Sequence, residues 1–335
     1  YIGKYANTPD APVTGYAALG KSGGYGGPMT IAVGVDANGK ITGVAIIDHK
    51  ETLPFLKKVL DKKIPASLEG KSYSDEFVPG ADVDGVSGAT RSANALASAT
   101  RHGARRVADR ALKLKIPPEP SPPIRFGFPE ILLILLFISG FMAYHKKIPA
   151  KAKKAIRWGS LLTGLVVLGF VLTVPLSLIQ VNSLLMGYWP DWHTHIFWYL
   201  LMAGVLLPLL LAGKSPYCDT FCPFGAAQEC LKVIGGGKKK VPRTYHRYLK
   251  FIQRFLALAA VMAALILRNP AYNNYEVFGT FFNLTGTYIQ FGLMAAVVLA
   301  ALFLTRPWCN YLCPLRAVSD MLKQIRRLAI KPREQ

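Results

Sequence analysis

The second half of the sequence alternates apolar stretches with basic segments, and this pattern restricts the fold more than any other feature. Each apolar stretch is close to the roughly 20 residues that a helix needs to cross about 30 Å of hydrocarbon. The five stretches are residues 128–144, 158–181, 195–213, 249–267 and 287–305. One such stretch is compatible with a core helix of a soluble protein, whereas five in succession predict an all-α polytopic membrane domain. We therefore expect five transmembrane helices within residues 128–335.

The basic residues between the stretches predict how the helices are oriented. Segments 145–157, 214–250 and 306–335 contain six, eight and seven Lys or Arg residues, and segments 182–194 and 269–286 contain none. Lys and Arg accumulate on the cytoplasmic side of membrane proteins, so the three basic segments are expected in the cytoplasm. The aromatic residues of the two neutral segments, expected to form a belt at the outer face, are Tyr188, Trp189, Trp192, Tyr272, Tyr275 and Phe278. Residues 1–127 are then expected outside the cytoplasm.

The net charge of +21 indicates a membrane surface once its place along the chain is considered. Residues 128–335 contain 23 basic and 7 acidic side chains, although the chain as a whole is 51% hydrophobic with a mean hydropathy of +0.27. Basic residues that lie between apolar blocks are typical of a membrane face, so we expect the lipid bilayer as a partner and no nucleic acid. Because the sequence begins at Tyr1 without Met, we expect that processing or incomplete coverage has removed the true start, which leaves open an amino-terminal anchor helix.

Two cysteine motifs follow the third and the fifth apolar stretch. They read Cys218-Asp-Thr-Phe-Cys222-Pro223 and Cys309-Asn-Tyr-Leu-Cys313-Pro314. The apolar residues before them are also similar, with Leu-Met-Ala-Gly-Val in one stretch and Leu-Met-Ala-Ala-Val in the other. Two parallel copies of one hairpin imply that the four cysteines converge about a local pseudo-twofold axis. The sequence therefore predicts a metal site formed by Cys218, Cys222, Cys309 and Cys313.

The chemistry of these four cysteines has several alternatives. Buried structural thiols are common, but the duplication of the whole spacing argues against them. Disulfides are disfavoured because this side of the membrane is reducing. Zinc and iron–sulfur centres both use four cysteines, and the proline after a short cysteine spacing resembles ferredoxin-type ligation, so it favours iron–sulfur. Cys230 corresponds to Met321 in the repeat and is expected to be a packed thiol rather than a ligand.

Residues 1–116 are expected to form an α+β domain. Apolar, β-branched runs on both sides of Asn38-Gly39 predict a β-hairpin. The Ala- and Arg-rich residues 93–114 have helical spacing. Residues 117–127, with five prolines between Pro117 and Pro123, are expected to be a stiff linker to the membrane domain.

A segment of small residues precedes the predicted helix of this domain. It reads Asp84-Gly85-Val86-Ser87-Gly88-Ala89-Thr90-Arg91-Ser92. Its simplest interpretation is a turn that caps the helix. Small residues also let the backbone approach an anion, and a helix N-terminus attracts phosphate, so the hydroxyl of Thr90 would be presented to one. Glu51 and Asp84 are acidic residues for which turn and cap roles are preferred over an acid–base pair.

This segment closely resembles the flavinylation motif of the FMN-binding domain found in Rnf and Nqr subunits. The segments Gly-Tyr-Gly-Gly-Pro-Met and His49-Lys50-Glu51-Thr52 resemble the same domain. Together with the two cysteine motifs, the chain resembles the NosR/PceC family of flavin and iron–sulfur membrane proteins over nearly all of its length. The resemblance implies FMN bound covalently through a phosphoester to Thr90. The other residues that it implies for FMN binding are Tyr25, Gly26, Gly27, Pro28, Glu51, Thr52, Asp84, Gly85, Ser87, Gly88 and Ala89.

Two departures from the family pattern affect this expectation. Leu53-Pro54-Phe55 follows Thr52 where the family often has Pro-Gly, so contacts to the flavin ring on that side are not carried over. The Cys-x-x-Cys-x-x-Cys runs of the longer NosR-type members do not occur in these residues, so the shorter PceC-type members, usually with a leading transmembrane helix, are the expected match.

The resemblance implies an electron-transfer subunit of a bacterial-type cytoplasmic membrane, with residues 1–127 in the periplasm, rather than a stand-alone enzyme. Covalent FMN outside and a cluster, expected to be [4Fe–4S], at the cytoplasmic face would pass electrons between the quinone pool or a cytoplasmic ferredoxin-like donor and an extracytoplasmic redox enzyme or other subunits. About 30 Å of hydrocarbon prevents direct electron transfer between the flavin and the cluster. A quinone, a partner's cofactor or a movement of the flavin domain must therefore connect them.

A haem bridge is not expected, because no histidine lies in the middle of an apolar stretch. His193 and His195, at the outer edge, leave a role toward a quinone or a partner open. Two alternatives to electron transfer also stay open. One is a redox-sensing regulatory or assembly protein, and the other is a structural subunit of a larger membrane complex with a zinc site in place of the cluster.

Overall fold

The computed structural model consists of two compact units. The residues that it describes are 2–4, 13–24, 26–51, 53–85, 90–118, 126–193, 195–237, 242–271, 275–284 and 286–330. The first unit comprises Tyr1–Pro122, Asn182–Asp191 and Leu267–Tyr272, and the second comprises Pro123–Val181, Trp192–Ile266 and Asn273–Gln335.

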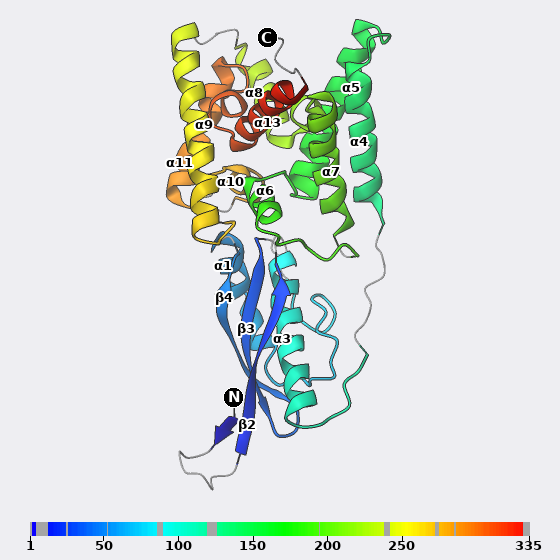
Figure 1. The fold of residues 1–335 in the computed structure, drawn as a ribbon, viewed down its shortest axis with the longest axis vertical. Helices are drawn as coiled ribbons and strands as arrows, with labels where there is room; N and C mark the ends of the chain where they lie inside the picture. The colour runs from blue at the N-terminus through cyan, green and yellow to red at the C-terminus, as the bar shows by residue number, and fades with distance from the viewer. Residues whose placement is uncertain are drawn as a thin grey trace. The chain divides into compact units, whose positions relative to one another are not determined.

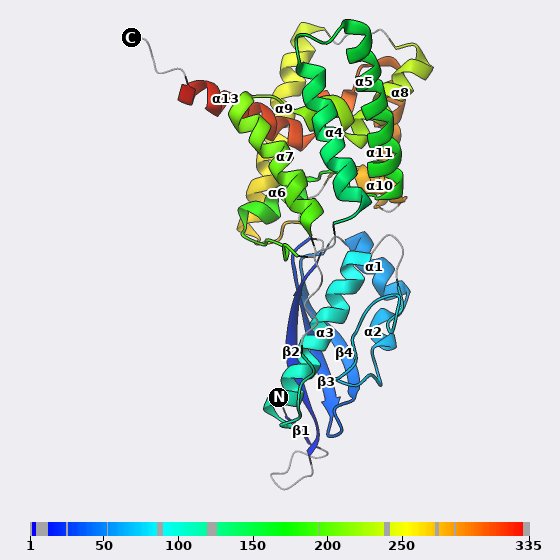
Figure 2. The ribbon, with the colours of Figure 1, turned by 90° about the vertical axis from the view of Figure 1, so that its right-hand side faces the viewer.

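The first unit contains an antiparallel sheet covered by a long helix (Figure 1). Its elements are β1 (Ile2–Lys4), β2 (Val13–Gly23), β3 (Pro28–Asp36), β4 (Ile41–His49), α1 (Leu53–Asp61), α2 (Ile64–Ser67) and α3 (Thr90–Arg110). The four strands lie in the order β1-β2-β3-β4. Helix α3 packs on β2 and β3, as Figure 2 shows from the side. The expected α+β fold is therefore confirmed for this part of the chain.

Strand β3 forms the centre of the core because its side chains alternate between the two faces of the sheet. Met29, Ile31, Val33 and Val35 are at most 1% exposed and belong to one cluster with the apolar side of α3. The helix approaches the sheet closely at Gly20, where an added Cβ would lie 1.8 Å from the carbonyl oxygen of Ala99. Alternation and small residues at the contact thus fix the position of α3 on the sheet.

The predicted hairpin is present between β3 and β4. Asp36 accepts hydrogen bonds from the amides of Asn38 and Lys40 at 2.9 and 2.8 Å. Gly39 has φ +83, a conformation that glycine adopts without the steric cost of a Cβ. The Asn-Gly turn that the sequence predicts is therefore present, stabilised by the Asp36 side chain and by the positive φ of Gly39.

The second half of the chain is mostly helical. Its elements are α4 (Phe128–Tyr144), α5 (Ala150–Thr163), the π-helix η1 (Gly164–Val171), α6 (Leu178–Leu185), α7 (Ile196–Ala212), the π-helix η2 (Tyr217–Phe221), α8 (Pro223–Gly235), α9 (Arg243–Ile266), α10 (Phe278–Asn283), α11 (Tyr288–Phe303), α12 (Pro307–Tyr311) and α13 (Pro314–Ile330). Every apolar stretch of the sequence contains one of these helices, so the mostly helical character of this half is confirmed.

Two of the described helices are long and apolar enough to cross a membrane, namely Ala150–Val171 and Thr244–Ile266. Three shorter apolar helices are Phe128–Tyr144, Ile196–Ala212 and Tyr288–Phe303. Large apolar side chains point outward from these helices, such as Leu211 at 73% and Phe251 at 67% exposure. A surface of this kind favours an apolar surrounding. Two candidate spans are thus present, and the count of five remains a prediction.

The second predicted span, residues 158–181, differs from the structure. The helix formed by α5 and η1 begins at Ala150 and ends at Val171, and α6 is a separate helix. The break lies at Thr173, which has φ +51, and at Pro175, which disfavours helical backbone in the residue before it. The boundary was wrong because hydropathy alone does not register a turn made of apolar residues.

The predicted outer belt is wrong for two of its members. The Tyr275 hydroxyl donates to the carbonyl oxygen of Leu312 at 3.1 Å, next to the second cysteine motif. Phe278 is 5% exposed and its ring packs against those of Phe224 and Trp308. These aromatic residues are part of the interior of the helical unit, because they contact residues that lie next to the cysteines of the two motifs.

Candidate functional site

The two cysteine motifs have equivalent backbone structures. The amide of Cys222 donates to the carbonyl oxygen of Tyr217, and the amide of Cys313 donates to that of Trp308, both at 2.8 Å. Both bonds span five residues, the spacing of a π-turn, which recurs at functional sites. A proline then starts α8 after the first motif and α13 after the second. The internal repeat seen in the sequence is therefore confirmed.

Large aromatic side chains anchor both motifs in the interior. Tyr217 and Trp308 occupy equivalent positions and are 2% and 0% exposed. The Tyr217 hydroxyl accepts the amide of Leu176 at 2.9 Å, in the segment between η1 and α6. Gly164 of η1 lies so close to the first motif that an added Cβ would be 2.2 Å from the carbonyl oxygen of Phe221. The motifs are thus fixed by packing on several helices.

The four cysteines of the two motifs lie near one another. Burial raises the pKa of Cys218, and the neighbouring Cys222 and Cys309 thiols raise it further. Burial and Cys309 likewise raise the pKa of Cys222 to about 12. Cys313 is buried and interacts with Cys309 and Cys218 in the same way. Thiols in such surroundings stay protonated until a metal replaces the protons.

Four cysteines can bind either a single ion or a cluster, and the two need different geometries. Among the residues described here, no three His, Cys, Asp or Glu side chains lie close enough together to bind one metal ion. Zinc needs sulfur atoms about 2.3 Å from one centre. In an iron–sulfur cluster of the cubane type each thiolate binds a different iron atom, so the sulfur atoms surround a larger body. The two kinds of site thus require different separations between the sulfur atoms.

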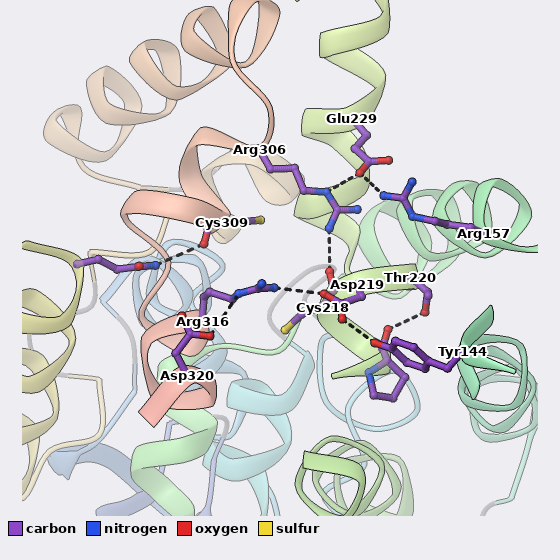
Figure 3. A network of polar contacts seen from close by, with 12 residues as sticks. Tyr144, Arg157, Cys218, Asp219, Thr220, Glu229, Arg306, Cys309, Arg316 and Asp320 are labelled. Carbon is purple, nitrogen blue, oxygen red and sulfur yellow. Dashed lines mark hydrogen bonds and ion pairs between the residues drawn. The ribbon is translucent and has the colours of Figure 1, made fainter. Parts of the chain in front are cut away.

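An arginine connects the first motif to the helix that follows it (Figure 3). Arg306 Nη1 donates to the carbonyl oxygen of Cys218 at 2.9 Å. Its Nε pairs with Glu229 Oε1 of α8 at 2.8 Å, and Arg157 of α5 pairs with the same oxygen. Arg306 precedes the second motif in the chain, so its side chain ties the two motifs together.

A second arginine pairs with Asp219, the residue after Cys218 (Figure 3). Arg316 Nη1 donates to Asp219 Oδ1 at 3.2 Å, and Tyr144 Oη donates to Asp219 Oδ2 at 2.6 Å. Arg316 Nε also lies 3.7 Å from Asp320 Oδ1. The two arginines partly balance the negative charge that four thiolates would place in this region.

Helix α9 supports the second motif through a buried glutamine. Gln253 is 0% exposed, and its Nε2 donates to the carbonyl oxygens of Cys313 at 2.8 Å and Cys309 at 3.4 Å. Lys250 Nζ donates to Gln253 Oε1 at 3.2 Å. Sequence reasoning missed this residue, although a glutamine within an otherwise apolar run was a usable signal because buried amides need partners.

Glu51 brings three sequence segments together in the first unit. The residue is 3% exposed, and its carboxylate accepts hydrogen bonds from the Gly26 amide at 3.4 Å and from the Ser92 hydroxyl at 2.7 Å. Ser92 lies in the first turn of α3, which begins at Thr90. An added Cβ at Gly24 would lie 1.8 Å from Glu51 Oε1, so a larger residue there would displace this carboxylate. The glycine-rich loop, the end of β4 and the start of α3 thus converge on one carboxylate.

The structure describes part of the predicted flavin site. Gly26 and Gly27 lie against Lys50, with an added Cβ at Gly26 only 2.0 Å from the Lys50 carbonyl oxygen, and Pro28 begins β3. Asp84 and Gly85 precede α3 and are exposed. Thr90 is described only as the first residue of α3. The predicted residues that lie outside the described ones are Tyr25, Thr52, Ser87, Gly88 and Ala89. His49 Nδ1 is buried and has no hydrogen-bond partner among the residues that the structure describes.

A second buried carboxylate lies near the cysteines. Glu276 is 4% exposed, and both of its oxygens accept the Leu178 amide at 3.0 Å. Burial raises its pKa from 4.5 to about 8, and the Leu178 amide opposes that shift only in part. Glu276 also raises the pKa of Cys313, so it lies within electrostatic reach of the second motif.

The raised pKa of Glu276 predicts a pH-dependent stability. Between 4.5 and about 8 the folded protein holds a proton that the unfolded chain has lost, so the free energy of unfolding falls as pH rises through this window. The slope is at most about 1.4 kcal/mol for each pH unit. Thermal unfolding in detergent between pH 5 and 8 measures this slope, and Glu276→Gln is expected to flatten the dependence of stability on pH.

The control is Glu130→Gln, which removes the carboxylate that caps α4. An unchanged slope in Glu276→Gln would contradict the prediction.

Comparison with known proteins connects both halves of the chain with cofactors. The FMN-binding domain family matches residues 24–104, and the 4Fe-4S binding domain family matches residues 194–242 and 288–333. The first match covers the glycine-rich loop, Glu51 and the start of α3. The second covers both cysteine motifs with the helices that carry them. Flavin and iron–sulfur cofactors are therefore supported by separate parts of the sequence.

Three relatives share part of this sequence. Protein NirI of Paracoccus denitrificans is 34% identical over 179 residues, which are 49% of this chain and 26% of NirI. Regulatory protein NosR of Pseudomonas aeruginosa is 28% identical over 56% of this chain and 27% of its own length. The putative electron transport protein YccM of Escherichia coli is 26% identical over 44% of each chain. The match thus spans about a quarter of NirI and NosR. The resemblance to NosR-type membrane flavoproteins is confirmed, with an FMN-binding domain and a 4Fe–4S binding domain in one chain.

Proposed function

We propose that this protein transfers electrons in the cytoplasmic membrane of a bacterium, between an FMN in the first unit and an iron–sulfur cluster in the helical unit. The observation that carries the proposal is the presence of two separate cofactor domains in one polypeptide. A bound flavin supplies exchange between two-electron and one-electron chemistry, and a cluster supplies one-electron storage. The chain's own residues hold and orient these groups.

In the helical unit, Cys218, Cys222, Cys309 and Cys313 are the proposed cluster ligands, and the cluster is of the [4Fe–4S] type. The equivalent turns present one pair of thiols from each copy of the repeat. Arg306 and Arg316 place positive charge beside the first pair. This charge supports the thiolate state that metal binding requires.

In the first unit, Thr90 is the proposed attachment residue, through a phosphoester between its hydroxyl and the FMN phosphate. Support comes from its place at the first position of α3, where the free amides and the positive end of the helix dipole favour a phosphate. The Ser92 hydroxyl bonded to Glu51 fixes this helix start against the glycine-rich loop. A covalent link keeps the flavin bound in an open compartment.

The basic segments support a topology with the cysteine motifs toward the cytoplasm and residues 1–127 in the periplasm. The electrons would pass between a quinone or a cytoplasmic donor and an extracytoplasmic redox enzyme. Five membrane crossings belong to this proposal. A regulatory role is the second candidate, because a relative over 56% of the chain is named Regulatory protein NosR.

The experiment that tests electron transfer uses the full chain in sealed liposomes with a quinone in the bilayer. A membrane-impermeant reductant added outside is expected to reduce the flavin and then the cluster, followed by flavin absorbance and by EPR. Thr90→Val is expected to abolish cluster reduction from outside while dithionite still reduces the cluster after detergent is added. If the cluster of Thr90→Val is reduced from outside as fast as that of the wild type, the flavin is not part of the electron path. Cluster reduction far slower than the turnover of a partner enzyme would favour the regulatory role.

A further inference from the structure

One buried side chain donates directly to a cysteine sulfur. Gln228 lies in α8, six residues after Cys222, and is 1% exposed. Its Nε2 lies 3.3 Å from Cys309 Sγ in the other copy of the repeat. The residue therefore reaches across from the helix of the first motif to a proposed ligand of the second.

The surrounding contacts fix which end of the Gln228 amide faces the sulfur. The Trp308 amide donates to Gln228 Oε1 at 2.9 Å, so this atom must be the oxygen. Nε2 then has two hydrogens, and one is directed to the carbonyl oxygen of Phe224 at 3.0 Å. The second hydrogen is available to Cys309. A buried amide with its bonds arranged in this way has no freedom to turn away from the sulfur.

The bond makes the two copies of the repeat unequal. The residue equivalent to Gln228 is Ser319, ten residues after the first cysteine of its motif, and it carries a short hydroxyl side chain in place of the amide. The first motif instead has Arg306, whose Nη1 donates to the carbonyl oxygen of Cys218 rather than to its sulfur. Cys309 thus differs electrostatically from its counterpart Cys218.

We propose that Gln228 raises the reduction potential of the iron–sulfur cluster by donating an N–H···S hydrogen bond to Cys309. The inference rests on the proposed function, in which the four cysteines hold this cluster. Reduction adds one electron to the cluster from the reduced flavin or from an added reductant, and no covalent bond is made or broken. The added charge is shared by the thiolate sulfurs, so a donor to one sulfur stabilises the reduced state more than the oxidised one. Burial of the Gln228 amide strengthens the effect.

The test is an anaerobic redox titration of the full chain followed by EPR, on the wild type and Gln228→Leu. About a tenfold loss of electron affinity is expected, which lowers the midpoint potential by about 59 mV for a one-electron couple. Gln253→Leu is the matched control, because it removes a buried glutamine that contacts the same motif through carbonyl oxygens and not through a sulfur. Its potential is expected to shift clearly less. An unchanged potential in Gln228→Leu with full iron content overturns the proposal.

A measurement on the wild type keeps the proposal testable if Gln228→Leu does not fold. Glutamine side chains are labelled with ¹⁵N, and pulsed EPR of the reduced cluster is expected to detect a coupling to one of them. Absence of this coupling, in protein that contains iron, overturns the proposal and leaves the proposed electron-transfer function standing. Protein that contains no iron rejects the proposed function itself.

Discussion

Replacement of Cys309 by alanine is expected to abolish the iron–sulfur centre while the protein still inserts into the membrane. The visible absorbance of the cluster and its EPR signal should disappear, and iron content should fall to the background level. The reason is that each of four thiolates binds its own iron atom, so loss of one exposes an iron to solvent or to a foreign ligand. The same result is expected for Cys218, Cys222 and Cys313.

The geometry around Cys309 supports a loss of the whole centre rather than a modest weakening. Its sulfur accepts Gln228 Nε2, and its carbonyl oxygen accepts Gln253 Nε2, so the ligand is held from both α8 and α9. Alanine removes the sulfur, so Gln228 Nε2 loses this acceptor while the carbonyl oxygen that accepts Gln253 remains, and no other described cysteine of the motifs is free to replace the ligand. Cys230, which is half-buried and lies outside the two motifs, is the natural control.

Cys230→Ala is expected to retain full iron content and an unchanged EPR spectrum. Elemental analysis of the four motif variants and of this control, on purified protein, decides the ligand set. A motif variant with wild-type iron and spectrum would remove that cysteine from the set. Stoichiometric zinc with no iron in the wild type would instead support the structural-subunit alternative.

The sequence is sufficient to predict the repeated turns of the two cysteine motifs, but not the side-chain contacts that surround them. The two cysteine motifs share their spacing and flanking residues, so equal turns follow, and the structure has them at Cys222 and Cys313. The contacts of Gln228, Gln253 and Glu229 join segments tens of residues apart. No periodicity in the sequence relates such positions, because the contact depends on how the helices pack.

The same contrast explains the errors in the membrane half. Hydropathy locates apolar helices well, since α4 begins and ends where the apolar stretch 128–144 does. Hydropathy does not distinguish an aromatic side chain that faces lipid from one that packs in the interior, and Phe278 packs in the interior. In the first unit, Glu51 was expected to have a turn or cap role, and its actual bonds to Gly26 and Ser92 became visible only with α3 in place.

Replacement of Thr90 by valine is expected to abolish covalent flavin attachment. Valine has nearly the same shape as threonine and lacks only the hydroxyl that would form the phosphoester, so α3 should still begin at this position. The denatured wild-type polypeptide should show yellow flavin fluorescence in a gel, and Thr90→Val should show none. Thr90→Ser, which keeps a hydroxyl, is expected to retain part of the label.

Glu51 provides a second variant that separates attachment chemistry from the shape of the site. Glu51→Ala removes the carboxylate that joins the Gly26 amide to the Ser92 hydroxyl, and leaves both donors buried without that partner. Because the helix start is then no longer fixed against the glycine-rich loop, the yield of labelled protein should fall severalfold while Thr90 is still present. The matched control is Asp109→Ala, which changes an exposed acidic residue near the other end of the same helix. Undiminished fluorescence in denatured Thr90→Val, with the label found on another peptide by mass spectrometry, would refute Thr90 as the attachment residue. Full labelling of Glu51→Ala would show that the flavin site forms without the carboxylate bridge.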